Sequence, residues 1–184
     1  QTLNIINGHN GNSYNSLNKE WLIKLKRILT GALNVKQDYL MKLFAVTGPM
    51  ASGKNTVCSI LEEEGFACVD ADILAHKAVE IGKEQILQQF SKIAEEKNIS
   101  LLNSDGTINR RNLGQIVFLS EENLKTQEKI VHPIVTQMME DFINENFSQN
   151  KNVVLNATVL YKTPLIKKAD VIIYVTAPFL KRLF

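Results

Sequence analysis

The sequence feature that most restricts the fold is a glycine-rich loop that ends in lysine and stands between an apolar run and a helical pattern. The loop reads Gly48-Pro49-Met50-Ala51-Ser52-Gly53-Lys54, and the run before it reads Leu43-Phe44-Ala45-Val46-Thr47. A short continuous apolar run followed by glycine is typical of a buried parallel strand. A helix is predicted from about residue 54 to 64. The G-x-x-x-x-G-K spacing between a strand and a helix therefore predicts a phosphate-binding loop.

The loop has the chemistry that a polyphosphate needs. Glycines let the backbone wrap the phosphates, so that successive N–H groups form an anion-binding nest. The N-terminus of the following helix adds a partial positive charge, and Lys54 reaches the β- and γ-phosphates as a point charge. The sequence contains no Asn-Lys-x-Asp guanine signature, which favours ATP over GTP.

Asn55 stands where a serine or threonine hydroxyl usually holds Mg²⁺. An amide carbonyl is also a hard oxygen that Mg²⁺ accepts. On a helix the side chain of the next residue, Thr56, is turned away by about 100°. Asn55 itself is therefore predicted to face the metal, directly or through a water molecule.

The rest of the pattern predicts an α/β fold of the P-loop NTPase type, three-layered, with a parallel sheet and a helical insertion. A second strand at 66–69 follows the first helix, and further strands are predicted at 153–155 and 171–175. Between them the pattern is helical, with Pro133 near the start of a helical run. We expect a kinase domain over 41–184 with the insertion, at about 80–148, holding a second substrate.

Residues 1–40 differ in character from this domain. Residues 1–15 contain turn signals and predict a flexible leader, and residues 16–34 form an apolar stripe that predicts a basic amphipathic helix. Packing against the domain, or being the remnant of an upstream segment, is the favoured interpretation of that helix. Tethering to a partner or surface is the alternative, which deletion of residues 1–40 would test.

Acidic residues end the second strand, in Val69-Asp70-Ala71-Asp72. Ligands of open α/β sheets gather beyond the carboxyl ends of the strands. A carboxylate there can orient a substrate hydroxyl in line with the γ-phosphate. Asp70 is predicted to cap the following helix or to support the site from behind, and Asp72 to be the base.

Composition narrows the class of protein. The chain is 45% hydrophobic and 22% charged, as expected of a soluble globular protein. It has no secretory signal pattern and no run of about 20 apolar residues. Two cysteines, Cys58 and Cys68, form no disulfide framework and are predicted to be buried. A cytoplasmic setting is expected. The net charge of +2 gives no general basic surface for nucleic acid.

Five spaced motifs resemble the dephospho-CoA kinase family. They are the phosphate loop, Gly65-Phe66 to Ala75-His76, Asp105-Gly106 with Asn109-Arg110, Leu113-Gly114 with Val117-Phe118, and Ile130-Val131-His132-Pro133-Ile134. The resemblance covers about residues 43–183. It implies that Gly48 and the residues from Ala51 to Thr56 (Ala51, Ser52, Gly53, Lys54, Asn55 and Thr56) bind ATP and that Asp72 is the catalytic carboxylate. It also implies that Arg110 and His132 help to hold dephospho-CoA, whose ribose 3′-hydroxyl accepts the phosphate.

Two departures from the family pattern stand out. Where the family usually shows Asp-x-Pro-Leu-Leu-Phe-Glu, this chain has a run from Asn156 to Lys162, so that Asn156 replaces an aspartate and Lys162 a glutamate. The family also continues into an arginine-bearing lid, and the chain ends at Phe184 where that lid should begin, with Arg182 as its first basic residue. The lid is either absent or not represented here.

Two other functions fit the same sequence. One is a P-loop kinase for a nucleoside monophosphate or a small alcohol, which would share the sheet site and differ in the insertion. The other is a catalytically weak ATP-binding protein, which Asn55, Asn156 and Lys162 would favour. The oligomeric state is not predicted.

Overall fold

The computed structural model describes residues 2–6, 41–157 and 164–176. The predicted helix at 16–34, Lys162 and Arg182 lie outside the described residues. The helices and strands follow one another as β1 (Thr2–Ile6), β2 (Leu43–Thr47), α2 (Lys54–Glu63), β3 (Ala67–Asp70), α3 (Ala71–Ile81), α4 (Lys83–Glu96), α5 (Arg110–Val117), α6 (Glu121–Ser148), β4 (Val153–Asn156), the 3-10 helix η2 (Pro164–Lys168) and β5 (Val171–Thr176).

The chain divides into two compact units. The first comprises residues 1–68 and 146–184, and the second comprises residues 69–145. The strands form one five-stranded sheet in the order β1-β5-β2-β4-β3. The β1–β5, β5–β2 and β2–β4 pairs are parallel, which confirms the predicted α/β class with a parallel sheet.

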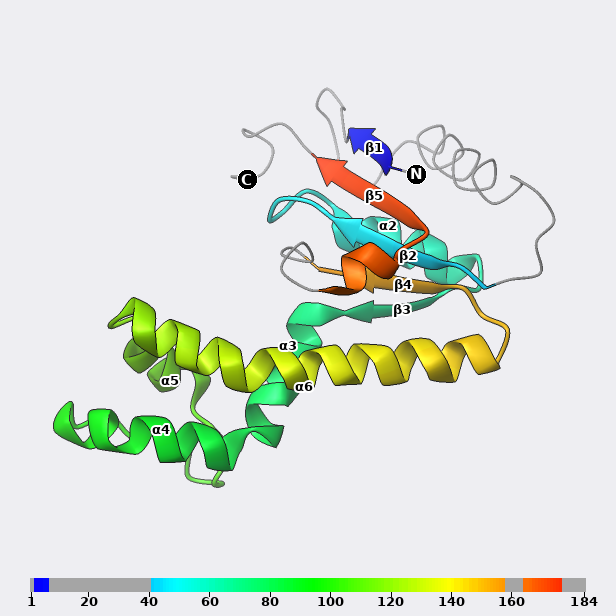
Figure 1. Ribbon diagram of the computed structural model, residues 1–184. Helices are drawn as coiled ribbons and strands as arrows, with labels where there is room; N and C mark the ends of the chain where they lie inside the picture. Colours follow the sequence, from blue (N-terminus) through cyan, green and yellow to red (C-terminus); the bar gives the residue numbers. More distant parts are fainter. Residues whose placement is uncertain (1, 7–40, 158–163, 177–184) are drawn as a thin grey trace. The chain divides into compact units, whose positions relative to one another are not determined.

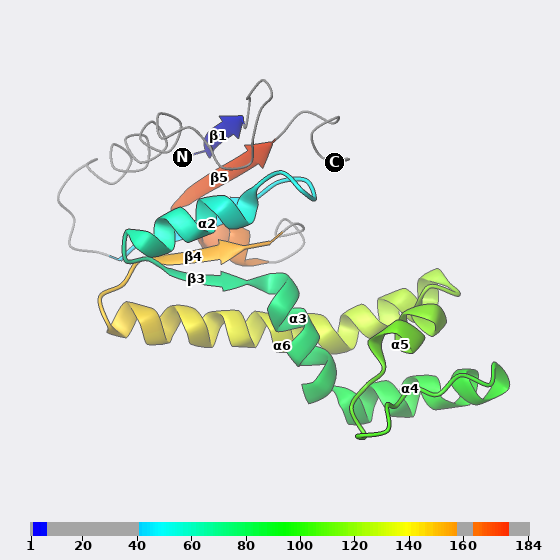
Figure 2. The same ribbon diagram turned by 180° about the vertical axis from the view of Figure 1, so that it is seen from behind.

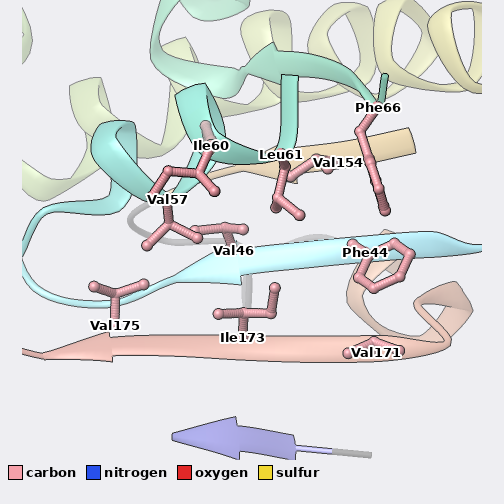
Figure 3. Packing of buried hydrophobic residues seen from close by; sticks show 11 residues of the cluster. Phe44, Val46, Val57, Ile60, Leu61, Phe66, Val154, Val171, Ile173 and Val175 are labelled. Atoms are coloured by element: carbon pink, nitrogen blue, oxygen red, sulfur yellow. The ribbon is translucent and has the colours of Figure 1, made fainter. Parts of the chain in front are cut away.

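The core of the first unit lies between the sheet and α2. This helix places Val57, Ile60 and Leu61 against apolar side chains of β2 and β5 (Figure 3). Phe44 of β2 meets Phe66 edge to face, with ring centroids 5.1 Å apart. Figure 2 shows α2 lying along the strands of this sheet. Burial of this apolar stripe is the main force that holds the helix, and the loop before it, on the sheet.

α2 ends at Glu63, close to the predicted end at about residue 64, and a glycine follows its C-cap. Gly65 has φ +86°, a left-handed conformation that other residues adopt at a cost. Its N–H donates to the carbonyl of Glu62 at 2.9 Å, and the N–H of Phe66 donates to that of Leu61 at 3.0 Å. These two bonds form a Schellman motif, which turns the chain from α2 into β3.

The N-terminal residues contribute a strand that the sequence pattern does not predict. Residues 2–6 form β1, in register with β5 from the Thr2–Ile172 pair to the Ile6–Thr176 pair. The flexible leader expected over 1–15 is therefore wrong for these five residues. A strand this short acquires its conformation from its partner, about 170 residues away, and local pattern does not report that pairing.

The second unit is helical, as the sequence predicts. Gly82 joins α3 to α4, and a Cβ placed there would lie 2.9 Å from Ile130 and 3.2 Å from Ile134 of α6. Pro133 lies within α6 rather than near a helix start. The loop before α5 is fastened to α3, because the Glu80 carboxylate accepts the N–H of Ile108 at 2.9 Å.

Candidate active site

The phosphate loop runs from the end of β2 at Thr47 to the start of α2 at Lys54. Three of its residues have positive φ: Gly48 (+148°), Ala51 (+57°) and Gly53 (+96°). These angles turn the backbone back on itself within a few residues, as a loop that presents its N–H groups to an anion requires. Of the predicted residues, Gly48 to Gly53 lie in this loop, and Lys54, Asn55 and Thr56 follow at the start of α2.

Gly48 is required by a close approach to the neighbouring strand. A Cβ on this residue would lie 2.0 Å from the carbonyl oxygen of Val175, in β5. No side chain fits in that space. The backbone at the start of the loop therefore lies in close contact with β5, and this contact fixes where the loop begins.

Lys54 is bound to the loop that precedes it. Its ammonium donates to the carbonyl oxygens of Gly48 at 3.1 Å and Pro49 at 3.0 Å. The residue is only 9% exposed, so the charge is held within the loop. This position is suited to an incoming polyphosphate, whose oxygens are stronger acceptors than carbonyls.

The start of α2 supports anion binding. Gly53 caps this helix without a side-chain hydrogen bond, and the first turn contains no acidic residue. The side chains of the first turn thus leave the partial positive charge of the helix N-terminus uncancelled. Ser52 is fully buried, and its hydroxyl has no hydrogen-bond partner among the described residues. Ser52 is one of the residues that the resemblance assigns to ATP binding, and its role there stays a prediction.

Asn55 and Asn156 meet beside the loop. The Asn156 side-chain amide donates to Oδ1 of Asn55 at 2.9 Å. Asn156 ends β4 and pairs in register with Val46 of β2. Because these two strands are neighbours, their carboxyl ends bring residues 101 positions apart into contact. The Asn55 oxygen suits Mg²⁺ as one hard ligand, and it also accepts this hydrogen bond.

Asp70 and Asp72, at the end of β3 and the start of α3, have different environments, and Asp70 caps the helix as the sequence predicts. Its Oδ1 accepts the N–H of Asp72 at 2.8 Å, and Asp70 is the N-cap of α3. Asp72 stands in the first turn of α3 with an exposed side chain. The capping prediction is confirmed, whereas the catalytic role of Asp72 stays a prediction.

Arg110 and His132 both lie in the second unit. Arg110 begins α5 directly after its N-cap, Asn109, and His132 lies inside α6. Both side chains are exposed. No hydrogen bond or ion pair joins Asp72, Arg110 or His132 to one another within the described part of the chain. Their substrate-binding roles stay predictions.

The Asp105-Gly106 turn before α5 is stabilised by a carboxylate. Asp105 accepts hydrogen bonds from the hydroxyl of Thr107 at 2.6 Å and from its N–H at 2.9 Å. These bonds lower the pKa of Asp105 below its usual value. The side chain of Lys83 donates to the carbonyl of Gly106. The turn is therefore an ordered part of the second unit.

The two cysteines do not form a nucleophilic site. Cys58 is buried on α2, and Cys68 on β3 is partly exposed. The thiol of Cys68 donates to the carbonyl of Cys58 at 3.5 Å. The neighbouring Cys58 thiol and burial raise the pKa of Cys68 far above its usual range, which disfavours the thiolate. Within the described ranges, no cluster of three or more His, Cys, Asp or Glu side chains suits a metal ion.

A parallel sheet with a lysine-ended phosphate loop between β2 and α2 defines the class of P-loop nucleotide-binding proteins. The part of the chain that the structure describes contains no helix long and apolar enough to span a bilayer.

Comparison with known proteins narrows this class. The chain matches the family model for dephospho-CoA kinase over residues 42–184. It is 38% identical over 143 residues to the dephospho-CoA kinase of Treponema denticola, covering 77% of this chain and 64% of that protein. For the dephospho-CoA kinase of Bacillus licheniformis the identity is 38% over 137 residues, covering 74% and 66%. The structure of dephospho-CoA kinase from Campylobacter jejuni matches with TM-score 0.63 and 26% identity, covering 71% of this chain and 64% of that chain.

The chain belongs to the dephospho-CoA kinase family, which confirms the resemblance seen in the motifs. It spans about two thirds of the length of the curated relatives that it matches.

Proposed function

We propose that this chain transfers the γ-phosphate of ATP to the ribose 3′-hydroxyl of dephospho-CoA, giving coenzyme A and ADP. A bond forms between the 3′-oxygen and the γ-phosphorus. The bond from the γ-phosphorus to the β–γ bridging oxygen breaks, and its electron pair leaves with ADP. The observation that carries the proposal is the family match over residues 42–184, which includes the phosphate loop and Lys54.

The loop residues and Asp72 have distinct roles in this proposal. The backbone from Gly48 to Thr56 cradles the phosphates, and Lys54 stabilises the charge on the β- and γ-phosphates. The Asp72 carboxylate orients the 3′-hydroxyl and takes its proton. The exposed position of Asp72 at the start of α3 leaves it accessible to a substrate.

The helical insertion, at about 80–148, is proposed to hold dephospho-CoA. Arg110 and His132 are its candidate contacts, and both have exposed side chains that a substrate can reach. We further propose a kinase domain over 41–184, with residues 1–40 as an N-terminal addition whose strand β1 joins the sheet, and a cytoplasmic setting without nucleic-acid partners.

Mg²⁺ is proposed as the metal that accompanies ATP, where it would bridge phosphate oxygens and neutralise their charge. Asn55 is the residue that would hold it, because its amide oxygen stands at the second position of α2.

ATP binding with slow turnover is a second candidate function. The neutral Asn55–Asn156 pair favours it, because neither side chain supplies a negative charge for a metal ion.

An assay of ADP release with ATP, Mg²⁺ and dephospho-CoA tests both functions. We expect release to require dephospho-CoA and to fall by at least about 100-fold in Lys54→Ala and in Asp72→Ala. Release with a nucleoside monophosphate instead of dephospho-CoA would contradict the proposed substrate. ATP binding without release from any acceptor would favour the second candidate.

A further inference from the structure

Asn156 donates its amide to the side-chain oxygen that stands at the metal position of the phosphate loop. The Nδ2–Oδ1 distance to Asn55 is 2.9 Å. Asn156 is 4% exposed, whereas Asn55 is exposed. The donor is thus held by the end of β4, and the acceptor reaches to it from α2. A ligand that approaches the Asn55 oxygen meets an atom already engaged by a fixed partner.

The pair is electrically neutral. Mg²⁺ gives up its hydration water reluctantly and is usually held by one or two carboxylates together with the phosphates of the nucleotide. An amide oxygen carries only a partial negative charge. Here that oxygen also accepts a hydrogen bond from the Asn156 N–H group. The pull of these two residues on the metal is therefore weak.

The same neutrality helps ATP to bind without a metal. The loop has the buried ammonium of Lys54 and an α2 first turn without acidic residues. A carboxylate at the end of β4 would repel the phosphates unless a cation lay between them. With asparagine at that position, this source of repulsion is absent.

We propose that the Asn55–Asn156 pair uncouples ATP binding from Mg²⁺ in this chain, and that Asn156 is the residue that sets the metal dependence. The inference rests on the proposed function for the assignment of ATP to the loop. It concerns binding and not turnover.

The test is ATP affinity, measured by calorimetry on the full chain with excess EDTA and again with saturating Mg²⁺. For the wild type we expect the two dissociation constants to agree within about threefold. For Asn156→Asp we expect affinity in EDTA to fall by about tenfold or more relative to the wild type, and Mg²⁺ to restore most of it.

Asn152→Asp is the matched control. Asn152 directly precedes β4, and its Oδ1 accepts the N–H of Lys42 at 2.9 Å. An aspartate there makes the same change of charge and keeps an oxygen for that bond, but it stands at the opposite end of the strand. Its Mg²⁺ dependence should equal that of the wild type.

Two results would overturn the inference. One is a wild-type affinity for ATP that falls more than about tenfold in EDTA, a measurement that needs no variant to fold. The other is an unchanged metal dependence in a folded Asn156→Asp protein. A failure of the kinase proposal is distinguishable, because ADP release would then be missing while the wild-type affinity for ATP stays the same in EDTA and in Mg²⁺. Absence of ATP binding under both conditions would overturn both.

Discussion

Gly48 shows how one residue position connects the sheet to the site. It has φ +148°, and a Cβ there would lie 2.0 Å from the Val175 carbonyl. Gly65 also has positive φ, at +86°, but a Cβ there would meet nothing within 4 Å. A substitution at Gly65 therefore introduces backbone strain alone, whereas one at Gly48 adds a steric conflict with a neighbouring strand.

We expect Gly65→Ala to lower the free energy of unfolding by about 1–2 kcal/mol, the cost of placing a Cβ in a left-handed conformation. Gly48→Ala should cost about 3 kcal/mol or more, because a backbone clash adds to that strain. It should also weaken ATP binding at least about tenfold, since the loop must move away from β5. Urea unfolding and ATP titration measure the two effects. Equal losses of stability would contradict the role given to the Val175 contact.

Two aspartates with different roles stand at the N-terminal end of α3, Asp70 as its N-cap and Asp72 in its first turn. Asp70 caps the helix through its 2.8 Å bond to the N–H of Asp72. Asp72 is exposed in the first turn. Capping residues contribute to helix stability, whereas an exposed carboxylate in the first turn adds little.

Substitution of Asp70 should therefore affect mainly stability, and substitution of Asp72 mainly activity. We expect Asp70→Ala to lower the free energy of unfolding by about 0.5–2 kcal/mol, and Asp70→Asn, which keeps a capping oxygen, to change it little. Asp72→Asn should change stability by less than about 1 kcal/mol and lower kcat by about 100-fold or more. Thermal unfolding and ADP release on the same samples decide this. A folded Asp72→Asn protein with wild-type kcat would exclude Asp72 as the base.

These elements also show what the sequence could predict. The strands from β2 to β5, α2 and the turn at Gly65 follow from apolar runs and glycines that act within a few residues. The phosphate loop and the Asp70 cap also depend on residues close together in the sequence, so they could be predicted too.

Contacts between distant segments lay beyond the sequence pattern. The Asn55–Asn156 bond depends on β2 and β4 being neighbours, and the place of Gly48 depends on β5. Pro133 is a case in which a local signal was misleading. Proline usually interrupts a helix, so the pattern predicted a helix start near it, but Pro133 lies inside α6.

For the whole chain, the sheet extends beyond the segment that the family match covers. The match begins at residue 42, yet residues 2–6 pair with residues 172–176 of β5. β5 also provides the carbonyl against which Gly48 lies. A strand that precedes the matched segment thus covers the edge of the strand that fixes the phosphate loop, and an uncovered edge is prone to pair with other chains.

Proline substitutions in β1 test this arrangement. Successive N–H groups along a strand point to opposite sides, so that only one of Asn4→Pro and Ile5→Pro removes a donor directed at β5. We expect one of the two to lower the free energy of unfolding by about 1–3 kcal/mol and the other to have a smaller effect. Hydrogen exchange of the β5 amides should quicken in the same variant. If both variants leave stability and exchange unchanged, β1 does not support β5. Loss in both alike would point instead to a general effect of proline on the segment.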